Sequence, residues 1–285
     1  MPSIALPDGR SLAFAEYGDQ RGNPVFFFHG TPGSRFFRPP GGITSQTGVH
    51  LICVDRPGYG LFHFQPGRRI LDWPEDILQL ADSLGLDKFA VAGHSGGGPY
   101  ALACAFALPA RVRSAVVLCG AGPIDTPGIT AGMTATNKFG LWVSRFIPWS
   151  IWQVLVWFIY HRRAADPAAD LARCNGHRPP ADDDELRNPE VRESCIQSEL
   201  EAFRPGLRGL AWDVHLLTLP WGFRLEDIRV PVYLWFGGED DLANPGMARH
   251  MSEKIPGCKT ISLDHEAHLL LFSHWQEILT QLISE

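Results

Sequence analysis

A serine enclosed by glycines is the first residue of this chain that could do chemistry. Residues 93–97 read Gly-His-Ser-Gly-Gly and fit the pattern G-x-S-x-G, with an apolar run before them and a helical pattern after them. A strand-to-helix turn this tight requires glycine at positions 93 and 97 and lifts the Ser95 hydroxyl clear of the sheet. The Gly96 N–H then lies at a helix start, where it can bind an oxyanion. The alternative is a glycine-rich turn that holds a serine by chance.

The elements that must position this serine alternate between strands and helices. Alternation of this kind predicts an α/β fold with a mostly parallel, doubly wound sheet, covered by helices on both faces. The expected strands are nearly all apolar, and they span residues 11–18, 24–30, 49–55, 88–95, 114–120, 230–238 and 259–264. The expected helices span residues 72–85, 99–109, 245–255 and 274–283.

The alternation breaks in the middle of the chain, where the sequence indicates helices and loops. We therefore predict a core of residues 1–125 and 229–285, with residues 126–228 forming a helical lid over the carboxyl ends of the strands. Six of the nine tryptophans fall in the predicted lid, at positions 142, 149, 152, 157, 212 and 221. This composition predicts an apolar substrate, with Trp152 among the residues that contact it.

Four motifs together give the chain its resemblance to a known family. They are HGTPG at 29–33, DRPGYG at 55–60, GHSGG at 93–97, and the pair GGEDDLANP and HEAHLLLF at 237–245 and 265–272. With them the chain resembles the α/β-hydrolases that use a serine nucleophile, in the esterase and proline-iminopeptidase-like branches. The resemblance covers nearly all of the chain outside the predicted lid.

The resemblance implies a general base after the last strand, where His265 and His268 both stand. His268 follows the small residue Ala267 and precedes three leucines, as the family pattern has it, so His268 is favoured over His265. The spacing H-E-x-H does not place two zinc ligands on one helical face, and we expect no metal.

The acid that orients the base has three candidates. Asp241 fits the family spacing G-x-x-D-x-x-x-P with Gly238 and Pro245, which favours it over its neighbour Asp240. Asp125 is the third candidate, because some relatives place the acid after an earlier strand. The resulting order of serine, acid and histidine is the one that this fold uses.

The loop HGTPG is expected to complete the site. The resemblance assigns the second oxyanion donor to the backbone N–H of Thr31, beside Gly96. Gly30 and His94 are expected to contact the substrate, although packing is an equal alternative for His94. The motif DRPGYG is given a structural role.

Composition and charge exclude several classes of function. The formal net charge is −6 with no basic block, so a nucleic-acid partner is not expected. Six scattered cysteines without a C-x-x-C pair, and an N-terminus without a signal-peptide pattern, favour a cytoplasmic protein. The apolar stretch at 139–160 contains Arg145 and Pro148 and is short for a membrane span. We expect it to be buried or to face the substrate rather than to contact a membrane, and a membrane-surface or partner-binding helix at these residues is the alternative.

These observations predict a serine hydrolase that cleaves carboxylic esters through an acyl-enzyme, without a cofactor. Aminopeptidase, lactonase, thioesterase and carbon–carbon hydrolase activities use the same triad and stay open, with Glu199 and Glu201 as candidates to bind a substrate amino group. A small-molecule receptor of the same fold is the alternative from another class. The expected partner is a small apolar ester, and a homodimer is left open.

Overall fold

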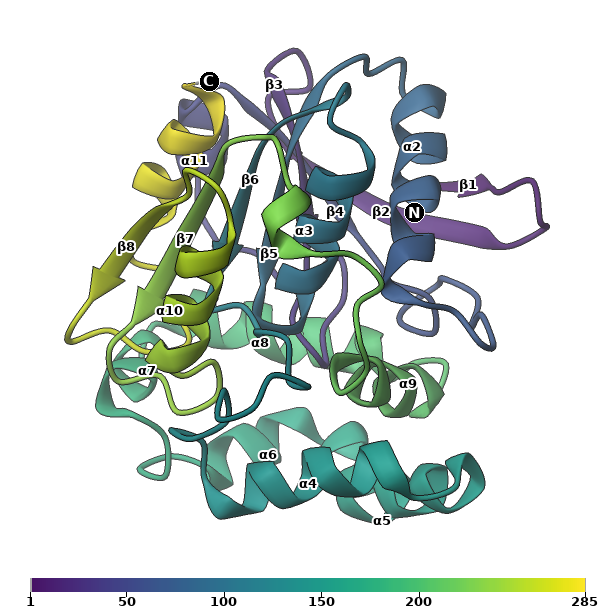
Figure 1. Cartoon of the computed structure of the whole chain (residues 1–285), viewed down its shortest axis with the longest axis vertical. Coiled ribbons are helices and arrows are strands. Elements are labelled where there is room, and N and C mark those ends of the chain that lie inside the picture. The colour runs from purple at the N-terminus through teal and green to yellow at the C-terminus, as the bar shows by residue number, and fades with distance from the viewer. Residues whose placement is uncertain (1, 285) are drawn as a thin grey trace.

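A single eight-stranded sheet runs through the centre of the molecule (Figure 1). The structure is a computed structural model, and it describes residues 2–284. The strands are β1 (Ser3–Ala5), β2 (Ser11–Gly18), β3 (Asn23–Phe28), β4 (Val49–Val54), β5 (Phe89–His94), β6 (Val112–Leu118), β7 (Val232–Gly237) and β8 (Lys259–Leu263). Their order is β1-β2-β4-β3-β5-β6-β7-β8, in which the pairs β1/β2 and β2/β4 are antiparallel and all others are parallel.

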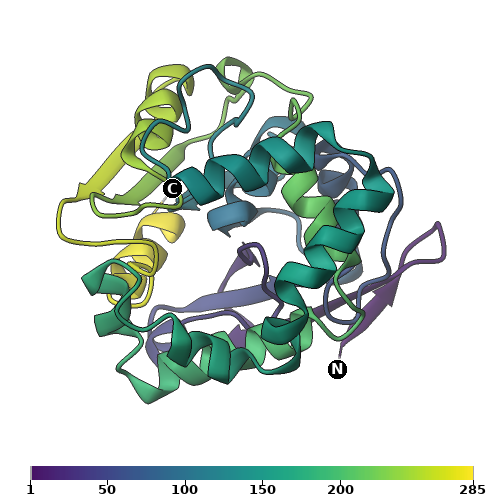
Figure 2. The ribbon, with the colours of Figure 1, turned by 90° about the horizontal axis from the view of Figure 1, so that it is seen from below.

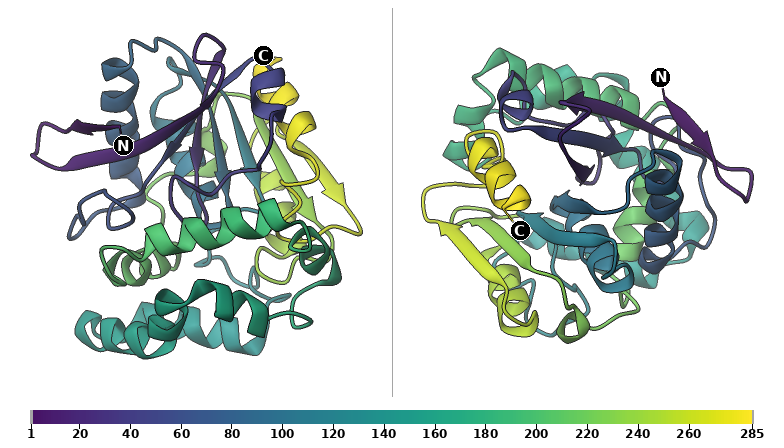
Figure 3. Two further views of the ribbon diagram at one scale, coloured as in Figure 1. Left: turned by 180° about the vertical axis from the view of Figure 1, so that it is seen from behind. Right: turned by 90° about the horizontal axis from the view of Figure 1, so that it is seen from above.

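Helices cover both faces of this sheet, as the alternating pattern predicted. The core helices are α1 (Ile43–Gln46), α2 (Trp73–Ser83), α3 (Gly98–Ala107), α10 (Pro245–Lys254) and α11 (Trp275–Ile283). Helices α2, α3 and α10 lie on one face (Figure 1), and α1 packs beside α11 on the other (Figure 3). Because strands β4, β5 and β7 are covered on both sides, every residue in them is buried, which explains their continuous apolar sequence.

A helical insertion separates β6 from β7 and lies beyond the carboxyl ends of the parallel strands (Figure 1). Its helices are α4 (Ala135–Phe146), α5 (Trp149–Ala165), α6 (Pro167–Arg173), α7 (Pro180–Glu185), α8 (Pro189–Ala202) and α9 (Arg208–Leu217). Short 3-10 turns complete the regular structure: η1 (Ile70–Asp72), η2 (Ser95–Gly97) and η3 (Leu225–Asp227). The division into a core and a separate lid domain of residues 126–228 stays a prediction.

The apolar stretch at 139–160 differs from its prediction. It forms most of α4 and α5, and only part of it is buried, whereas side chains such as Trp142 and Phe158 are 57% and 62% exposed. The stretch was expected to face the core or the substrate because its apolar residues are so many. The structure instead turns one side of each helix outward. None of the helices within residues 2–284 is both long enough and apolar enough to cross a membrane.

Candidate active site

Ser95 lies on a strained turn between β5 and α3. Its φ of 53° falls in the left-handed region, which a non-glycine residue rarely adopts. A Cβ atom on Gly93 would lie 2.3 Å from the Gly97 carbonyl oxygen, and one on Gly97 would lie 2.2 Å from the carbonyl oxygen of Phe28 in β3. Both glycines are therefore required by the close approach of the backbone, as the sequence predicted. The turn leaves Ser95 partly exposed, at the edge of a cavity.

His268 and Asp240 form a buried pair beside this turn. The loop after β8 supplies the histidine and the loop after β7 supplies the carboxylate, whose Oδ2 lies 2.8 Å from His268 Nδ1. The backbone N–H groups of Leu242 and Ala243 donate to the other carboxylate oxygen and so hold Asp240 in place. Because an ionised carboxylate can only accept, His268 Nδ1 carries the proton and Nε2 of the neutral ring is free to act as a base.

The electrostatics of the pair suit this role. Burial by itself lowers the pKa of His268, but the Asp240 carboxylate and its hydrogen bond outweigh burial, and the pKa lies above its ordinary 6.5. Burial likewise opposes ionisation of Asp240, yet His268 and the two backbone N–H groups lower the pKa of this carboxyl below 3.8. The protonated form of His268 is therefore stabilised by the carboxylate beside it.

The prediction of Asp241 as the acid is wrong in this geometry. Asp240 is 3% exposed and bound to the imidazole, whereas Asp241 is half-buried at the cavity wall. The sequence is ambiguous because the doubled glycine and the doubled aspartate allow both Gly237-x-x-Asp240 and Gly238-x-x-Asp241, and the spacing to the proline selected the wrong register. Asp125 is exposed and lines a different surface hollow, so the third candidate is also set aside.

The two candidate histidines lie in different surroundings. His268 lines the same cavity as Ser95, whereas His265 is exposed in the turn after β8. Within residues 2–284, no hydrogen bond joins Ser95 Oγ to His268 in this conformation. Such catalytic hydrogen bonds are often long before substrate binds and tighten in the complex.

His94 packs against His268 and hydrogen-bonds to its backbone. Its Nε2 donates to the backbone carbonyl of His268 at 2.9 Å, and its ring stacks on Phe37 at a centroid distance of 5.0 Å. Burial, followed by the nearby His268, lowers the pKa of His94 to about 3, so its ring is neutral. His94 also lines the cavity, and its buried Nδ1 has no partner among the described residues. The structure thus gives His94 a packing role and leaves its predicted contact with substrate open.

The oxyanion loop lies directly against the serine turn. A Cβ atom on Gly96 would lie 2.3 Å from Thr31 Oγ1 and 3.4 Å from the Thr31 backbone nitrogen. A Cβ atom on Gly30 would lie 3.2 Å from both His94 Nδ1 and Ser95 Cβ. The two predicted oxyanion donors, Gly96 and Thr31, therefore come from neighbouring segments beside Ser95. Gly30 lines the cavity, and its contact with substrate stays a prediction.

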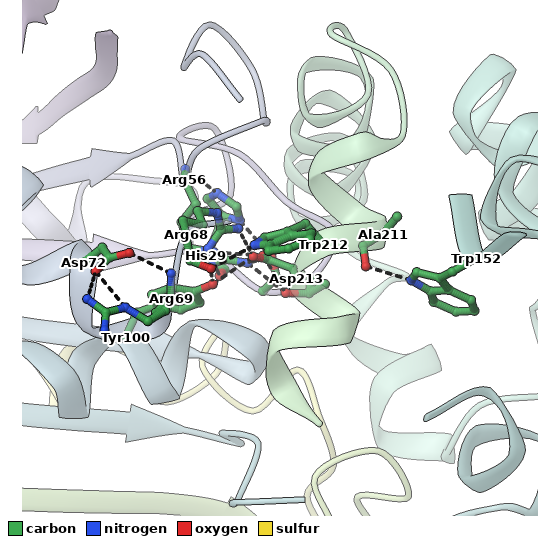
Figure 4. A network of polar contacts seen from close by, with 12 residues as sticks. His29, Arg56, Arg68, Arg69, Asp72, Tyr100, Trp152, Ala211, Trp212 and Asp213 are labelled. Carbon is green, nitrogen blue, oxygen red and sulfur yellow. Dashed lines mark hydrogen bonds and ion pairs between the residues drawn. The ribbon is translucent and has the colours of Figure 1, made fainter. Parts of the chain in front are cut away.

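A buried ion-pair network fixes this loop from the other side (Figure 4). Arg56 Nη2 lies 2.6 Å from Asp213 Oδ2 and also donates to Thr31 Oγ1 at 2.7 Å and to the Gly30 carbonyl at 3.2 Å. Arg68 pairs with the other oxygen of Asp213, to which Tyr100 donates at 2.8 Å. Asp213 belongs to α9, so the helical insertion itself holds the oxyanion loop in position.

The network sets two arginines, Arg56 and Arg68, against the single carboxylate of Asp213. Although burial opposes ionisation, Arg56 and Arg68 lower the pKa of Asp213 well below its usual range. Burial together with Arg56 also lowers the pKa of His29, the first residue of HGTPG, well below 6.5. The predicted structural role of DRPGYG is thus specific: Arg56 connects the insertion to the oxyanion loop. No local motif marks Asp213, Arg68 and Tyr100, so their part in this network could not be predicted from the sequence.

A second buried ion-pair network joins the insertion to the core. Asp55 accepts hydrogen bonds from the Arg35 side chain and backbone, and Arg35 Nη2 donates to Glu201 of α8 at 3.0 Å. Glu199, two residues earlier in α8, is held in two hydrogen bonds by Arg163. Both glutamates considered as ligands for a substrate amino group are therefore already paired with arginines, which disfavours the aminopeptidase alternative.

The cavity that contains Ser95 and His268 has a volume of about 470 Å³ and lies between the strand ends and the insertion. Its walls combine apolar side chains, such as Phe37, Leu186 and Leu269, with charged ones, such as Arg178 and Asp182. No tryptophan is among the described residues that line it.

The prediction that Trp152 contacts substrate is contradicted by this arrangement. Trp152 is 5% exposed and packs inside the insertion, where its indole N–H donates to the Ala211 carbonyl of α9 at 2.8 Å (Figure 4). The amphipathic ring of a tryptophan serves in a helix–helix contact as well as in a substrate pocket. Composition alone could not separate the two uses.

Three potential metal ligands lie close together around the Asp240–His268 pair. Donor atoms of Cys119, Asp240 and His268 lie within 4.8 Å of one another. Asp240 and His268 already bind each other, and burial raises the pKa of the Cys119 thiol well above 9, which makes it a poor ligand. The cluster is therefore the acid–base pair with a thiol beside it.

Comparison with known proteins agrees with this architecture. The model of the alpha/beta hydrolase family matches residues 25–281, and the chain belongs to this family. A pimeloyl-[acyl-carrier protein] methyl ester esterase of Legionella pneumophila is 26% identical over 273 residues, which cover 94% of this chain and 95% of the relative.

Solved structures share the same fold. A hydrolase from Pseudomonas aeruginosa matches with a TM-score of 0.69 and 18% identity, covering 99% of this chain and 97% of that one. An esterase from Exiguobacterium antarcticum matches with a TM-score of 0.68 and 18% identity over the same shares of the two chains. At this identity the likeness is one of fold.

Proposed function

We propose that this protein is a serine hydrolase that cleaves carboxylic esters through an acyl-enzyme intermediate. The observation that carries the proposal is the convergence of a strained, partly exposed Ser95 and the buried His268–Asp240 pair on one cavity. A full-length relative named as a methyl ester esterase supports the same class of reaction.

In the proposed mechanism Ser95 Oγ attacks the ester carbonyl carbon while His268 Nε2 takes the hydroxyl proton. The backbone N–H groups of Gly96 and Thr31 bind the oxyanion that develops, each contributing about 3 kcal/mol to stabilisation of the transition state. His268 returns the proton to the leaving alcohol. The same histidine then takes a proton from water, whose oxygen attacks the acyl carbon. The bond from Ser95 Oγ to the acyl carbon breaks, His268 returns the proton to Oγ, and the acid is released.

The proposed substrate has an acyl or alcohol part larger than a methyl or acetyl group. A cavity of about 470 Å³ has room for several carbons beyond the reacting carbonyl, and leucines and Phe37 form part of its wall. The tryptophans of the insertion do not support this preference, since none of them is among the described residues that line the cavity. We propose that the helical insertion acts as a lid that limits access of water to the acyl-enzyme.

Steady-state hydrolysis of a series of p-nitrophenyl esters, from acetate to octanoate, tests the proposal. We expect sustained turnover with a preference for chains longer than acetyl. Ser95→Ala should lose about 10³-fold or more of kcat/KM with an unchanged melting temperature, while Ser150→Ala, a change at an exposed serine of α5, should lose nothing. Ester binding without turnover would favour a receptor, and substantial activity in Ser95→Ala would exclude this serine as the nucleophile.

A further inference from the structure

The active site does not use the outward side of α4 and α5, which is unusually apolar. Of the twelve large hydrophobic side chains that are exposed within residues 2–284, nine lie between residues 139 and 159. We call these nine side chains the outer apolar face. Soluble proteins rarely expose so concentrated an apolar surface unless it contacts a partner or a membrane.

The spacing along α5 shows that one continuous side of the helix is exposed. Ile151, Val154, Leu155 and Phe158 recur at helical intervals and are each at least 37% exposed, while Trp152 and Val156 on the opposite side are buried. The usual orientation of an amphipathic helix places the larger apolar stripe inward. Here both sides are apolar, so burial of the inner stripe leaves a second one in solvent.

Helix α4 contributes to the same surface. Both α4 and α5 pack on α9, which separates them from the sheet, so their other sides look away from the core (Figure 2). On α4, Phe139, Trp142 and Phe146 are exposed and contact one another through their rings, with centroid distances of 6.3 and 5.6 Å. The outer apolar face therefore extends over two neighbouring helices at the end of the molecule farthest from the sheet.

The charge of this segment differs in sign from that of the whole protein. Residues 126–165 contain four basic side chains and no acidic one, whereas the chain carries a net charge of −6. Arg162 is exposed at the end of α5, and Lys138 is half-exposed on α4. Arg163 turns inward to Glu199, so it does not belong to this surface.

These charges distinguish between two possible occupants. A second copy docking on the same face would bring cations against cations, with no acid in the segment to pair them. An anionic lipid surface complements the cations, accepts the apolar side chains below its headgroups, and suits exposed indole rings such as those of Trp142 and Trp157. We propose that the outer apolar face docks on the surface of an anionic membrane without crossing it. The sequence favoured a buried or substrate-facing helix over a membrane-contacting one, and this proposal reverses that preference. It does not depend on the proposed esterase activity.

Vesicle co-sedimentation tests the proposal with the full-length protein. We expect binding to phosphatidylcholine vesicles that contain phosphatidylglycerol, and binding about tenfold weaker or more to phosphatidylcholine alone or at high salt. Trp142→Glu and Phe158→Glu should each reduce partitioning by about tenfold. Arg162→Gln should reduce it by about fivefold, the effect of one cation near an anionic surface.

Matched variants outside the face are the controls. Leu200 is an exposed apolar residue of α8 and Arg224 is an exposed cation near η3, so Leu200→Glu and Arg224→Gln should bind like the wild type. Brominated lipid should also quench the tryptophan fluorescence of the wild-type protein, a measurement that needs no variant. Equal binding to neutral and anionic vesicles, no binding at all, or full binding by Phe158→Glu would each overturn the proposal.

Light scattering of the lipid-free protein separates the second copy from the membrane. We expect a monomer at concentrations where vesicles are bound. A wild-type dimer that Phe158→Glu dissociates would show that the face is an interface between copies and would overturn the lipid assignment.

Discussion

The strand ends of the core and the helical insertion both contribute to the site, but they do so by different means. The core supplies reacting groups from short loops after β5, β7 and β8, each marked by a local motif. The insertion supplies support over long sequence distances, such as the contact of Asp213 with Arg56 across 157 residues. Changes in the core loops are therefore expected to affect chemistry, whereas changes inside the insertion are expected to affect the stability of the site.

The largest effect is expected at the base in the core. His268→Ala should lower kcat/KM by about 10⁴-fold or more because it removes the group proposed to take the Ser95 proton. His265→Ala is the matched control, since this histidine is exposed outside the cavity, and it should change kcat/KM less than about threefold. Steady-state kinetics on one ester would measure both, and the opposite ranking would reassign the base.

The two neighbouring aspartates give the next largest effect and the sharpest contrast within the core. Asp240→Asn removes the carboxylate that holds the His268 tautomer, so kcat should fall by about 10³- to 10⁴-fold. Asp241→Asn, one residue away, should leave kcat within about fivefold of the wild type. If Asp241→Asn were the damaging change, the register derived from the structure would be wrong.

A variant inside the insertion should affect stability. Asp213→Ala would leave Arg56 and Arg68 buried without their partner, and it should lower the free energy of unfolding by about 3–5 kcal/mol. Asp184→Ala removes an exposed ion pair with Arg187 on the same insertion and should change the free energy of unfolding by less than about 0.5 kcal/mol. Urea denaturation measures both, and equal effects would show that the buried network does not hold the insertion to the core.

The smallest effect is expected in the pH profile of kcat/KM, because carboxylates of both the core and the insertion act on the pKa of His268. The base works as neutral imidazole, so kcat/KM should rise with pH through a pKa above 6.5 and fall about tenfold per pH unit below it. Asp240→Asn should move this acid limb to lower pH because the main stabilising carboxylate is gone.

Asp182 allows the same test from the insertion. Its carboxylate, whose pKa burial raises to about 6, accepts from the Leu269 N–H and also raises the pKa of His268. Asp182→Asn keeps the hydrogen-bond acceptor and should move the acid limb in the same direction by a smaller amount than Asp240→Asn. If the acid limb of the pH profile did not move in either variant, the two carboxylates would not be what raises the pKa of His268.

The sequence predicted the features that depend on local backbone geometry. The serine turn was predictable because a Cβ atom on Gly93 or Gly97 would lie only 2.2–2.3 Å from a backbone oxygen, so both positions require glycine. The strands were predictable because burial on both faces of a sheet requires apolar runs. His268 was predictable from its neighbours. Asp240 was missed because duplicated residues left the register open.

The remaining features depend on pairings that no local pattern records. Asp213, Arg68 and Tyr100 meet only after the insertion folds onto the core. The apolar character of residues 139–160 was plain, but which side of α4 and α5 faces outward depends on the packing of α9 against them. Long-range packing, which one sequence alone does not reveal, decided both outcomes.

Covalent labelling with a fluorophosphonate, followed by mass spectrometry of the digested protein, shows whether Ser95 is the reactive nucleophile. We expect one adduct on Ser95 in the wild type, no adduct in Ser95→Ala, and slow labelling in Asp240→Asn but not in Asp241→Asn. An adduct on another residue, or a wild-type protein that takes up no label, would contradict this assignment.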